Sequence, residues 1–421
     1  MEQKIRHALA QTSRFLISRQ RRDGSWAMAG KIEKVPITYQ KPLILTAQVT
    51  NALIYAGLLE AIPAIKKGLF YCLNCKTDPE DDVDLWSWRL QALKFSNTPR
   101  SKAEREKILD FILKKQSSGG FWPSFPKPTV MSNFSIVCAV VDYAAKGSLD
   151  KAVGWFRKIK VGQGWGYDAS AKKPEISFTA NATLALITAG MEPSSPELQD
   201  AVEFLEKRQN KDGGWSMSSL TIADVSTTYS TAICALSLML LAEDPFNERV
   251  EKAISFLLAS QLASGQWPRF VGDKKIHYYP VYYVTKMLAF WLYLKEKWNS
   301  AEGRQLRRWL KPQQVAVHFF NQFEREVQHN LDRANLEAVL SSRAIGATQK
   351  ARARRLAIIQ ILADEGQLDV ADIIDALKKI KQYAYLNKKA HMTQIKYDLS
   401  YLKSINLLSQ INNEYYVVSK I

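Results

Sequence analysis

Cysteine and histidine are scarce in this chain, which has four cysteines and five histidines in 421 residues. Four cysteines do not provide a disulfide framework for a chain of this length, so a reducing compartment is expected. The N-terminus, MEQKIRHALAQ, lacks the apolar core of a signal peptide. The nearest candidate for a membrane span, PVYYVTKMLAFWLYLK at residues 280–295, is short and contains Lys286. We therefore expect a cytoplasmic protein without a transmembrane segment.

The chain is long enough for two or more domains, and its 47% hydrophobic content can form a sizeable core. Its formal charge is +17, with the basic residues denser in the last third. A basic balance favours polyanionic partners such as nucleic acid or an anionic membrane.

One short motif, Q-x3-G-x-W, occurs four times without variation. Each copy follows an aromatic–apolar pair, and the same longer template finds two degenerate copies, with Cys75 and Lys160 in the glutamine position. The four strict copies place a glutamine six residues before a tryptophan: Gln20 and Trp26, Gln116 and Trp122, Gln209 and Trp215, Gln261 and Trp267. The chain therefore contains six repeats of about 50 residues, which is a period typical of repeat architectures.

Each repeat has the pattern of two helices. The segment before the motif is amphipathic, whereas the segment after it is apolar most of the way round, which is typical of a helix buried on all sides. Six alternations predict an all-α fold, an (α/α)6 toroid over residues 1–298, whose closure buries both ends of the array. We expect the glycine to allow a tight turn, the tryptophan to fill the core and the glutamine to tie the turn to the next helix.

The motif resembles that of the prenyltransferase and squalene-oxidase repeat, found in terpene cyclases and protein prenyltransferase β subunits. The resemblance covers about 300 residues and implies a central cavity that accepts isoprenoids. The residues expected to line such a cavity are Asp224, Tyr229, Tyr279, Tyr282 and Tyr283.

The family's chemistry is not matched at the position where it is expected. Terpene cyclases of this family protonate their substrate with the middle aspartate of D-x-D-D-T-A, and the best match here is residues 224–228, DVSTT. Ser226 and Thr227 replace the two aspartates, and a hydroxyl is not a strong acid. The zinc ligands of prenyltransferases are also missing, since no cysteine follows Asp224 at the second position and Pro280 stands where the histidine would be. The sequence thus favours a degenerate toroid in which no catalytic residue is assigned, because neither the acid motif nor the zinc site of the family is matched, and it leaves open whether the chain is an enzyme.

An acidic cluster, DPEDDVDLW, lies in the second repeat. Glu80, Asp81 and Asp84 resemble the E-D-x-x-D motif of some diterpene cyclases, and their oxygens could hold Mg²⁺ and, through it, a diphosphate. The alternative is a solvated acidic loop. No other cofactor is expected.

The last third has a different organisation. Residues 299–348 read as a helical linker, and residues 349–421 as three helices followed by a hairpin around Asn412-Asn413, which resembles a winged helix-turn-helix domain. That resemblance implies a DNA contact through residues of the first and third helices: Arg352, Arg354, Arg355, Lys388, Lys389, Thr393, Gln394, Lys396, Tyr397 and Lys403. Winged helices also serve as protein-docking modules.

The sequence therefore favours a DNA-associated regulatory or effector protein. In this hypothesis the toroid binds an apolar ligand or a partner protein and the winged helix binds DNA. Two alternatives remain open: an isoprenoid-processing enzyme of the terpene cyclase or prenyl transfer type, and a scaffold subunit of a multi-protein complex.

Overall fold

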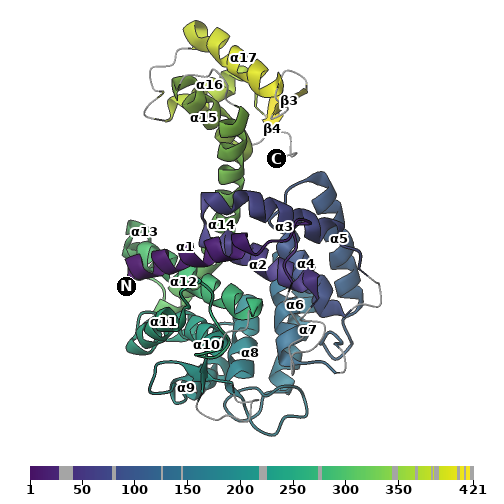
Figure 1. Cartoon of the computed structure of the whole chain (residues 1–421), viewed down its shortest axis with the longest axis vertical. Helices are drawn as coiled ribbons and strands as arrows, with labels where there is room; N and C mark the ends of the chain where they lie inside the picture. Colours follow the sequence, from purple (N-terminus) through teal and green to yellow (C-terminus); the bar gives the residue numbers. More distant parts are fainter. Residues whose placement is uncertain are drawn as a thin grey trace. The chain divides into compact units, whose positions relative to one another are not determined.

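Two separately packed units make up the chain (Figure 1). The first contains Met1–Ser96 and Ala103–Val327, and the second contains Asn97–Lys102 and Gln328–Ile421. No helix among the described residues is long and apolar enough to cross a membrane. The computed structural model describes residues 1–27, 41–77, 82–124, 127–143, 146–217, 225–273, 277–343, 349–365, 368–380, 383, 388–404, 408–411 and 414–417.

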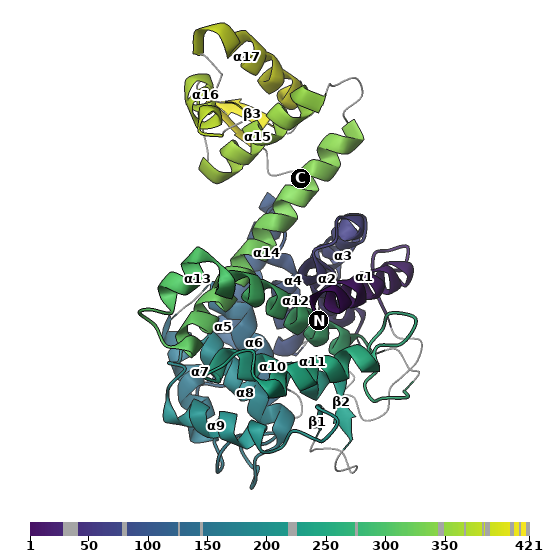
Figure 2. The ribbon, with the colours of Figure 1, turned by 90° about the vertical axis from the view of Figure 1, so that its left-hand side faces the viewer.

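Six inner helices form the centre of the first unit (Figures 1 and 2). Each packs against the inner helix before it and the one after it, and the last packs against the first, so their contacts form a closed cycle. These helices are α2 (Pro42–Ala56), α4 (Val83–Leu93), α6 (Val130–Val140), α8 (Ile176–Thr188), α10 (Thr228–Leu241) and α12 (Tyr278–Asn299).

The inner helices are buried on every side, as their sequences indicate. All residues of α4 and all residues of α10 are buried. Helix α2 begins with Pro42 in its first turn and ends at Gly57, whose φ of +68° is a left-handed conformation that glycine adopts at little cost. The N-terminus of α6 carries a capping box, in which the Thr129 and Ser132 side chains each bond the other residue's backbone N–H.

Six outer helices alternate with the inner ones along the chain. They are amphipathic: in α9, Leu198, Ala201, Val202 and Leu205 are buried at the spacing of one helix face. Their bounds are α1 (Glu2–Ser18), α3 (Ile62–Asn74), α5 (Pro99–Lys114), α7 (Lys146–Lys158), α9 (Pro196–Glu206) and α11 (Glu248–Ser260). Short elements join the helices: η2 (Leu59–Ala61), η3 (Val141–Tyr143), β1 (Trp215–Ser216) and β2 (Ser226–Thr227), the two strands pairing antiparallel.

The glutamines of the motif join successive outer helices. The Gln209 amide donates to the Gly213 carbonyl of its own turn at 2.9 Å and to the Arg249 carbonyl at the start of α11 at 2.8 Å. Gln20 and Gln116 make the same two kinds of bond, to α3 and α7. Each motif tryptophan is fully buried, and its indole N–H donates to the carbonyl ten residues earlier: Trp26, Trp122, Trp215 and Trp267.

The last strict motif joins α11 to the first helix of the chain. Gln261 donates to the Ala8 carbonyl and to the Thr12 hydroxyl, each at 2.9 Å, and Thr12 in turn donates to the Gly265 carbonyl at 2.6 Å. Gly265 has a φ of +93°, and a Cβ there would collide with the Gln11 carbonyl. The seam between α11 and α1 is therefore made of the same kinds of hydrogen bond as the junctions between outer helices that follow one another in the sequence.

Two further helices follow α12, namely α13 (Ala301–Leu306) and α14 (Pro312–Arg343). The part of α14 up to Val327 belongs to the first unit, where Val315, Phe319 and Phe323 are buried. Phe323 stacks on Tyr55 of α2 with ring centroids 5.7 Å apart, and Phe320 meets Phe290 of α12 edge to face at 5.1 Å. This segment, assigned to a linker on sequence, thus packs on two inner helices.

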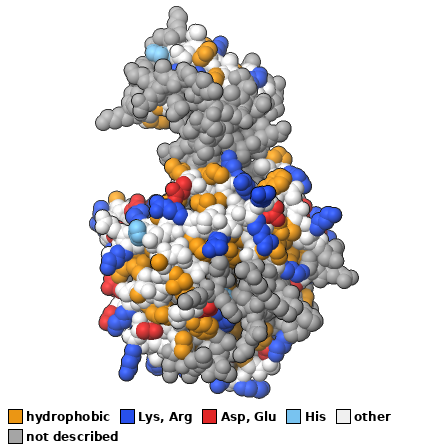
Figure 3. All heavy atoms as spheres, viewed as in Figure 1, with side chains coloured by type: hydrophobic (Ala, Val, Ile, Leu, Met, Phe, Trp, Pro, Cys, Tyr) orange, Lys and Arg blue, Asp and Glu red, His pale blue; other side chains and the backbone are white. Residues whose placement is uncertain are grey.

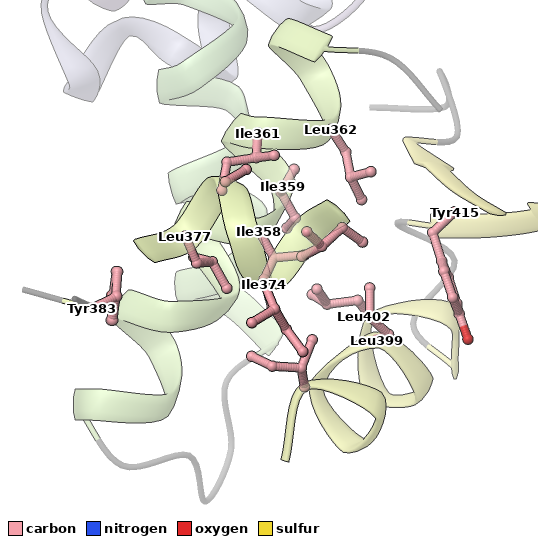
Figure 4. Close-up of a cluster of buried hydrophobic side chains, with 13 residues drawn as sticks. Ile358, Ile359, Ile361, Leu362, Ile374, Leu377, Tyr383, Leu399, Leu402 and Tyr415 are labelled. Carbon is pink, nitrogen blue, oxygen red and sulfur yellow. The ribbon is translucent and has the colours of Figure 1, made fainter. Parts of the chain in front are cut away.

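Beyond the end of α14, the described part of the second unit contains three helices and a hairpin with their own core (Figure 4). The elements are α15 (Gln349–Glu365), α16 (Val370–Lys378), α17 (Lys388–Ser404), β3 (Leu408–Ile411) and β4 (Glu414–Val417). Ile358, Leu377, Leu399 and Leu402 meet in this core, as Figure 4 shows. Leu368 forms an isolated antiparallel bridge with Tyr415 of β4.

Candidate functional site

Tyrosines fill the interior of the first unit. Tyr282 and Tyr283 of α12 are 4% and 7% exposed, with ring centroids 4.7 Å apart. Tyr229 of α10 meets Tyr283 at 5.0 Å and Tyr279 at 5.4 Å, and its hydroxyl donates to Asn181 at 3.0 Å. Four of the five residues expected to line a cavity therefore lie together. The fifth, Asp224, lies outside the described residues.

A buried carboxyl group lies beside these tyrosines. Asp84, in the first turn of α4, is 1% exposed, and the Ser87 hydroxyl lies 3.4 Å from its Oδ1. Burial raises the pKa of Tyr229 and of Tyr283 well above the usual range, and the negative charge of Asp84 adds to both shifts. Asp84 is thus within electrostatic reach of tyrosines on two other inner helices.

Sequence reasoning missed this position of Asp84. Its spacing from Glu80 and Asp81 suggested a metal ligand, but those two residues lie outside the described residues. Among the residues described, no group of three His, Cys, Asp or Glu side chains could hold a metal ion. The signal that places Asp84 is the apolar run LWSWRLQAL directly after it, which marks the beginning of an inner helix.

The described side chains leave a small cavity at the centre of this unit, of about 30 Å³. That volume holds a water molecule but not a prenyl chain. Trp88 of α4 and Tyr282 both line it and meet edge to face at 5.3 Å. The lining residues are Trp88, Gln91, Phe134, Ser135, Cys138, Leu184, Thr188, Leu236, Tyr282, Tyr283, Lys286 and Phe320.

A cluster of charged groups adjoins this cavity at Lys286. The Glu324 carboxylate of α14 accepts from Lys286 at 2.8 Å, from Lys94 at 3.0 Å and from the Tyr55 hydroxyl at 2.8 and 3.0 Å. Burial would raise the pKa of Glu324, but Lys286 and Lys94 outweigh it and lower that pKa from 4.5 to about 2. Burial acts to lower the pKa of each lysine, yet Glu324 raises both above the usual range. Sequence analysis did not identify this cluster.

The second unit corrects part of the predicted DNA surface. Arg354 and Arg355 do not face outward: their Nε atoms donate to Asp398 of α17 at 2.5 and 2.8 Å, and Asp398 is fully buried. Four predicted residues are exposed on α17, and a fifth, Lys403, is exposed and donates to Gln410 at 3.3 Å. The four are Thr393, Gln394, Lys396 and Tyr397. The side chains of Arg352, Lys388 and Lys389 lie outside the described set.

Positive charge is not confined to the second unit. Figure 3 shows lysine and arginine side chains interspersed with apolar and acidic ones on the described surface of the first unit. The net positive charge of the chain therefore does not specifically indicate a DNA-binding protein.

Comparison with known proteins identifies similarity to terpene cyclases. The model of the squalene-hopene cyclase C-terminal domain matches residues 175–290. Lanosterol synthase erg7A of Aspergillus fumigatus is 31% identical over 140 residues, 30% of this chain and 18% of that enzyme. Squalene–hopene cyclase of Bradyrhizobium diazoefficiens is 24% identical over 315 residues, 59% of this chain and 48% of that enzyme. The matches thus span less than half the length of these curated relatives.

Solved structures show the same fold. The type II terpene cyclase MstE from Scytonema superposes with a TM-score of 0.52 at 15% identity, over 69% of this chain and 98% of that one. MstE also has structures with geranylgeranyl dihydroxybenzoate, its substrate, and with merosterolic acid A, its product, at TM-scores of 0.51. A protein from Actinoplanes matches with a TM-score of 0.51 at 15% identity, over 67% of this chain and 97% of that one.

The chain is therefore mostly helical with a terpene cyclase-like fold, as the repeat predicted. The main functional hypothesis, a DNA-associated regulator, is wrong by the same findings. The curated relatives and MstE are enzymes that cyclise terpenes, and two of the arginines assigned to DNA form a buried ion-pair cluster instead. These findings favour the alternative that was set second, an isoprenoid-processing enzyme.

Proposed function

We propose that the first unit is an (α/α)6 toroid of six repeats that binds a linear isoprenoid and cyclises it by protonation. The observation that carries this proposal is the position of Asp84: a buried carboxyl group at the start of an inner helix, beside a cluster of tyrosines. The similarity to terpene cyclases in sequence and fold supports it.

In the proposed reaction Asp84 is the acid. Its carboxyl proton adds to the terminal double bond of the isoprenoid, and the next double bond attacks the resulting carbocation. The last carbocation loses a proton to solvent, and solvent returns a proton to the Asp84 carboxylate. The product is an isomer of the substrate. The faces of Tyr229, Tyr282 and Tyr283 are suited to stabilise the cations, since aromatic rings attract positive charge, and their burial keeps water away.

The aspartates missing from residues 224–228 do not argue against this reaction, because the acid is assigned to another repeat. Asp81 and Asp82 precede α4 in the sequence and Asp84 lies in its first turn, so the sequence places three aspartates at the start of an inner helix, in the order D-D-x-D where the family has D-x-D-D. Asp82 caps α4, its side chain accepting from the Asp84 N–H at 3.3 Å. The two neighbouring aspartates thus have separable roles, one in capping and one in chemistry.

The test is an assay of the purified full chain with geranylgeranyl diphosphate, geranylgeraniol and squalene. Products are resolved by gas chromatography, after phosphatase treatment where needed, because cyclised isomers keep the substrate's mass. Asp84→Asn should abolish product formation. Asp82→Asn is the matched control, since asparagine caps helices as well as aspartate does and activity should remain. Equal activity in wild type and Asp84→Asn would reject the proposal.

For the second unit we propose a winged helix, supported by the order of three helices followed by the β3–β4 hairpin. It is assigned as an accessory domain of the enzyme, with no role in the chemistry.

A further inference from the structure

The charged cluster at Glu324 combines groups of two origins. Tyr55, Lys94 and Lys286 come from inner helix α2, the C-terminal end of α4 and inner helix α12. Glu324 comes from α14, beyond the last inner helix. Asp142, half exposed in η3, also meets Lys94 at 3.4 Å. The inner helices thus provide two cations and a hydroxyl donor, and α14 provides the largely buried carboxylate that they share.

Stability of the fold does not account well for this arrangement. Removing charges from water costs about as much as their mutual attraction returns, so apolar residues of similar size would hold α14 at least as well. Phe319, Phe320 and Phe323 already pack this helix on the inner helices through apolar contacts. An ion cluster retained inside an aromatic interior is better explained by recognition of a ligand.

The cations are placed at the far end of the proposed reaction site. Lys94 follows α4 directly, and Asp84 lies ten residues earlier in that helix. At 1.5 Å per residue the two are separated by about 15 Å along the axis. Lys286 and Phe320 line the cavity that lies between, together with Trp88 and Tyr282. A substrate protonated at its terminal double bond by Asp84 would therefore reach the lysines with its other end.

We propose that Tyr55, Lys94 and Lys286 form a binding site for the anionic head group of an isoprenoid, and that Glu324 occupies this site whenever the isoprenoid does not. The proposal deepens the proposed function, because it names the substrate class: a prenyl chain with a diphosphate or carboxylate head. Glu324 imitates the head group with its carboxylate, and Phe320 fills space that the chain would take. Displacing this face of α14 enlarges a cavity that now holds no more than water.

The charges suit such an exchange. Both lysines stay protonated and the Glu324 carboxyl stays ionised at neutral pH. The two positive charges therefore always attract an anion, either the Glu324 carboxylate or the head group of a ligand. A diphosphate carries more negative charge than one carboxylate and accepts more hydrogen bonds. It can therefore compete with a carboxylate that is held in the same molecule.

Binding to the full-length chain tests the proposal, with tryptophan fluorescence as the readout. The probes are geranylgeranyl diphosphate, geranylgeranoic acid and geranylgeraniol, which share a chain and differ in the head. Glu324→Gln removes the competing charge and should tighten diphosphate binding roughly tenfold or more. Geranylgeraniol affinity should change little. Glu326→Gln is the matched control, because Glu326 lies on the same helix and pairs with Lys297 at 2.9 Å, away from the cavity.

A second variant covers the case in which Glu324→Gln does not fold. Lys286→Gln keeps the Lys94–Glu324 ion pair and should weaken diphosphate binding to the otherwise intact protein about tenfold. Unchanged diphosphate affinity in Lys286→Gln, or an equal gain for the alcohol and the diphosphate in Glu324→Gln, overturns the head-group site. Whichever of geranylgeranyl diphosphate and geranylgeranoic acid shows the larger change in affinity identifies the head group that the site binds.

The head-group site and the cyclase proposal can fail separately. Asp84→Asn should still bind the diphosphate with wild-type affinity, since Asp84 is remote from the lysines. If Glu324→Gln tightens binding but no isoprenoid is cyclised, the head-group site stands without the reaction. If the neutral alcohol is cyclised and Glu324→Gln changes no affinity, the reaction stands without the head-group site.

Discussion

Each unit of this protein buries one carboxylate between two cations, and the two clusters differ in what surrounds them. Asp398 is fully buried between Arg354 and Arg355, inside a unit whose helices all contribute to one apolar core. Glu324 is 16% exposed, meets two lysines and a tyrosine, and adjoins a cavity. The first arrangement fastens α15 to α17 through two ion pairs. The second resembles an occupied binding site, and the comparison teaches that the neighbourhood of an ion cluster, more than its charges, indicates its role.

The largest effect is expected from breaking the Asp398 cluster. Asp398→Asn leaves two nearly buried guanidinium groups without their anion and should cost about 3 to 5 kcal/mol of the unfolding free energy of the second unit. Urea unfolding followed by circular dichroism would measure it. No isoprenoid or diphosphate should restore the loss. A loss of less than about 1 kcal/mol in unfolding free energy would mean that the two arginines form hydrogen bonds with water or other acceptors in place of Asp398.

A similar loss of stability, but one that depends on pH, is expected at Glu324. Its folded-state pKa is about 2, below the value of 4.5 expected in the unfolded chain. This lowering of the pKa adds about 3 kcal/mol to the free energy of unfolding. The contribution is fully present above pH 4.5 and is lost as the pH falls through 2. Acid unfolding of wild type and Glu324→Gln would show it, because the variant should lack this part of the pH dependence. Parallel acid curves would contradict the prediction.

A smaller effect is expected from the Tyr55 hydroxyl group of the Glu324 cluster, which has no counterpart in the Asp398 cluster as described above. Tyr55→Phe removes a hydrogen bond to a buried carboxylate and should destabilise the first unit by about 1.5 kcal/mol. It should also raise the acid midpoint slightly, since that hydrogen bond helps to lower the pKa of Glu324. Thermal unfolding at pH 7 and pH 3 measures both effects. A variant as stable as wild type at both values would show that water replaces the hydroxyl.

The smallest effect is expected at an exposed ion pair of the second unit. Lys378 and Asp375 lie 3.3 Å apart, with side chains 35% and 45% exposed. Asp375→Asn should change the unfolding free energy by less than about 0.5 kcal/mol, because solvent and salt screen such pairs. Urea unfolding beside Asp398→Asn provides the scale for the comparison. A cost near that of Asp398→Asn would show that burial is not what separates the two pairs.

The helical, terpene cyclase-like fold could be predicted from the sequence because its determinants are local. Gln209, Gly213 and Trp215 act within a seven-residue turn, and the apolar inner helices follow from composition alone. The two clusters could not be predicted in this way. Glu324 lies in the charged stretch FNQFEREV, and its burial depends on Lys94 and Lys286, which are far away in sequence.

Two buried aspartates left a usable signal in the sequence. Asp398 is three residues after Ile395 and four before Leu402, so it shares their buried helix face and needs a cation there. That position indicates an internal partner for Arg354 and Arg355 rather than phosphate. Asp84 shows the same kind of signal, because it begins a helix in which every residue is buried. For a charged residue, a position on an apolar helix face therefore says more about its role than its spacing from other charged residues does.

The seam closed by Gln261 has a consequence for how the ring is held together. The Ala8 carbonyl and the Thr12 hydroxyl that it binds belong to α1, 253 and 249 residues away in the sequence, and no covalent link crosses between α11 and α1 at this point. The first unit is therefore closed between the two ends of its helix array by noncovalent contacts alone.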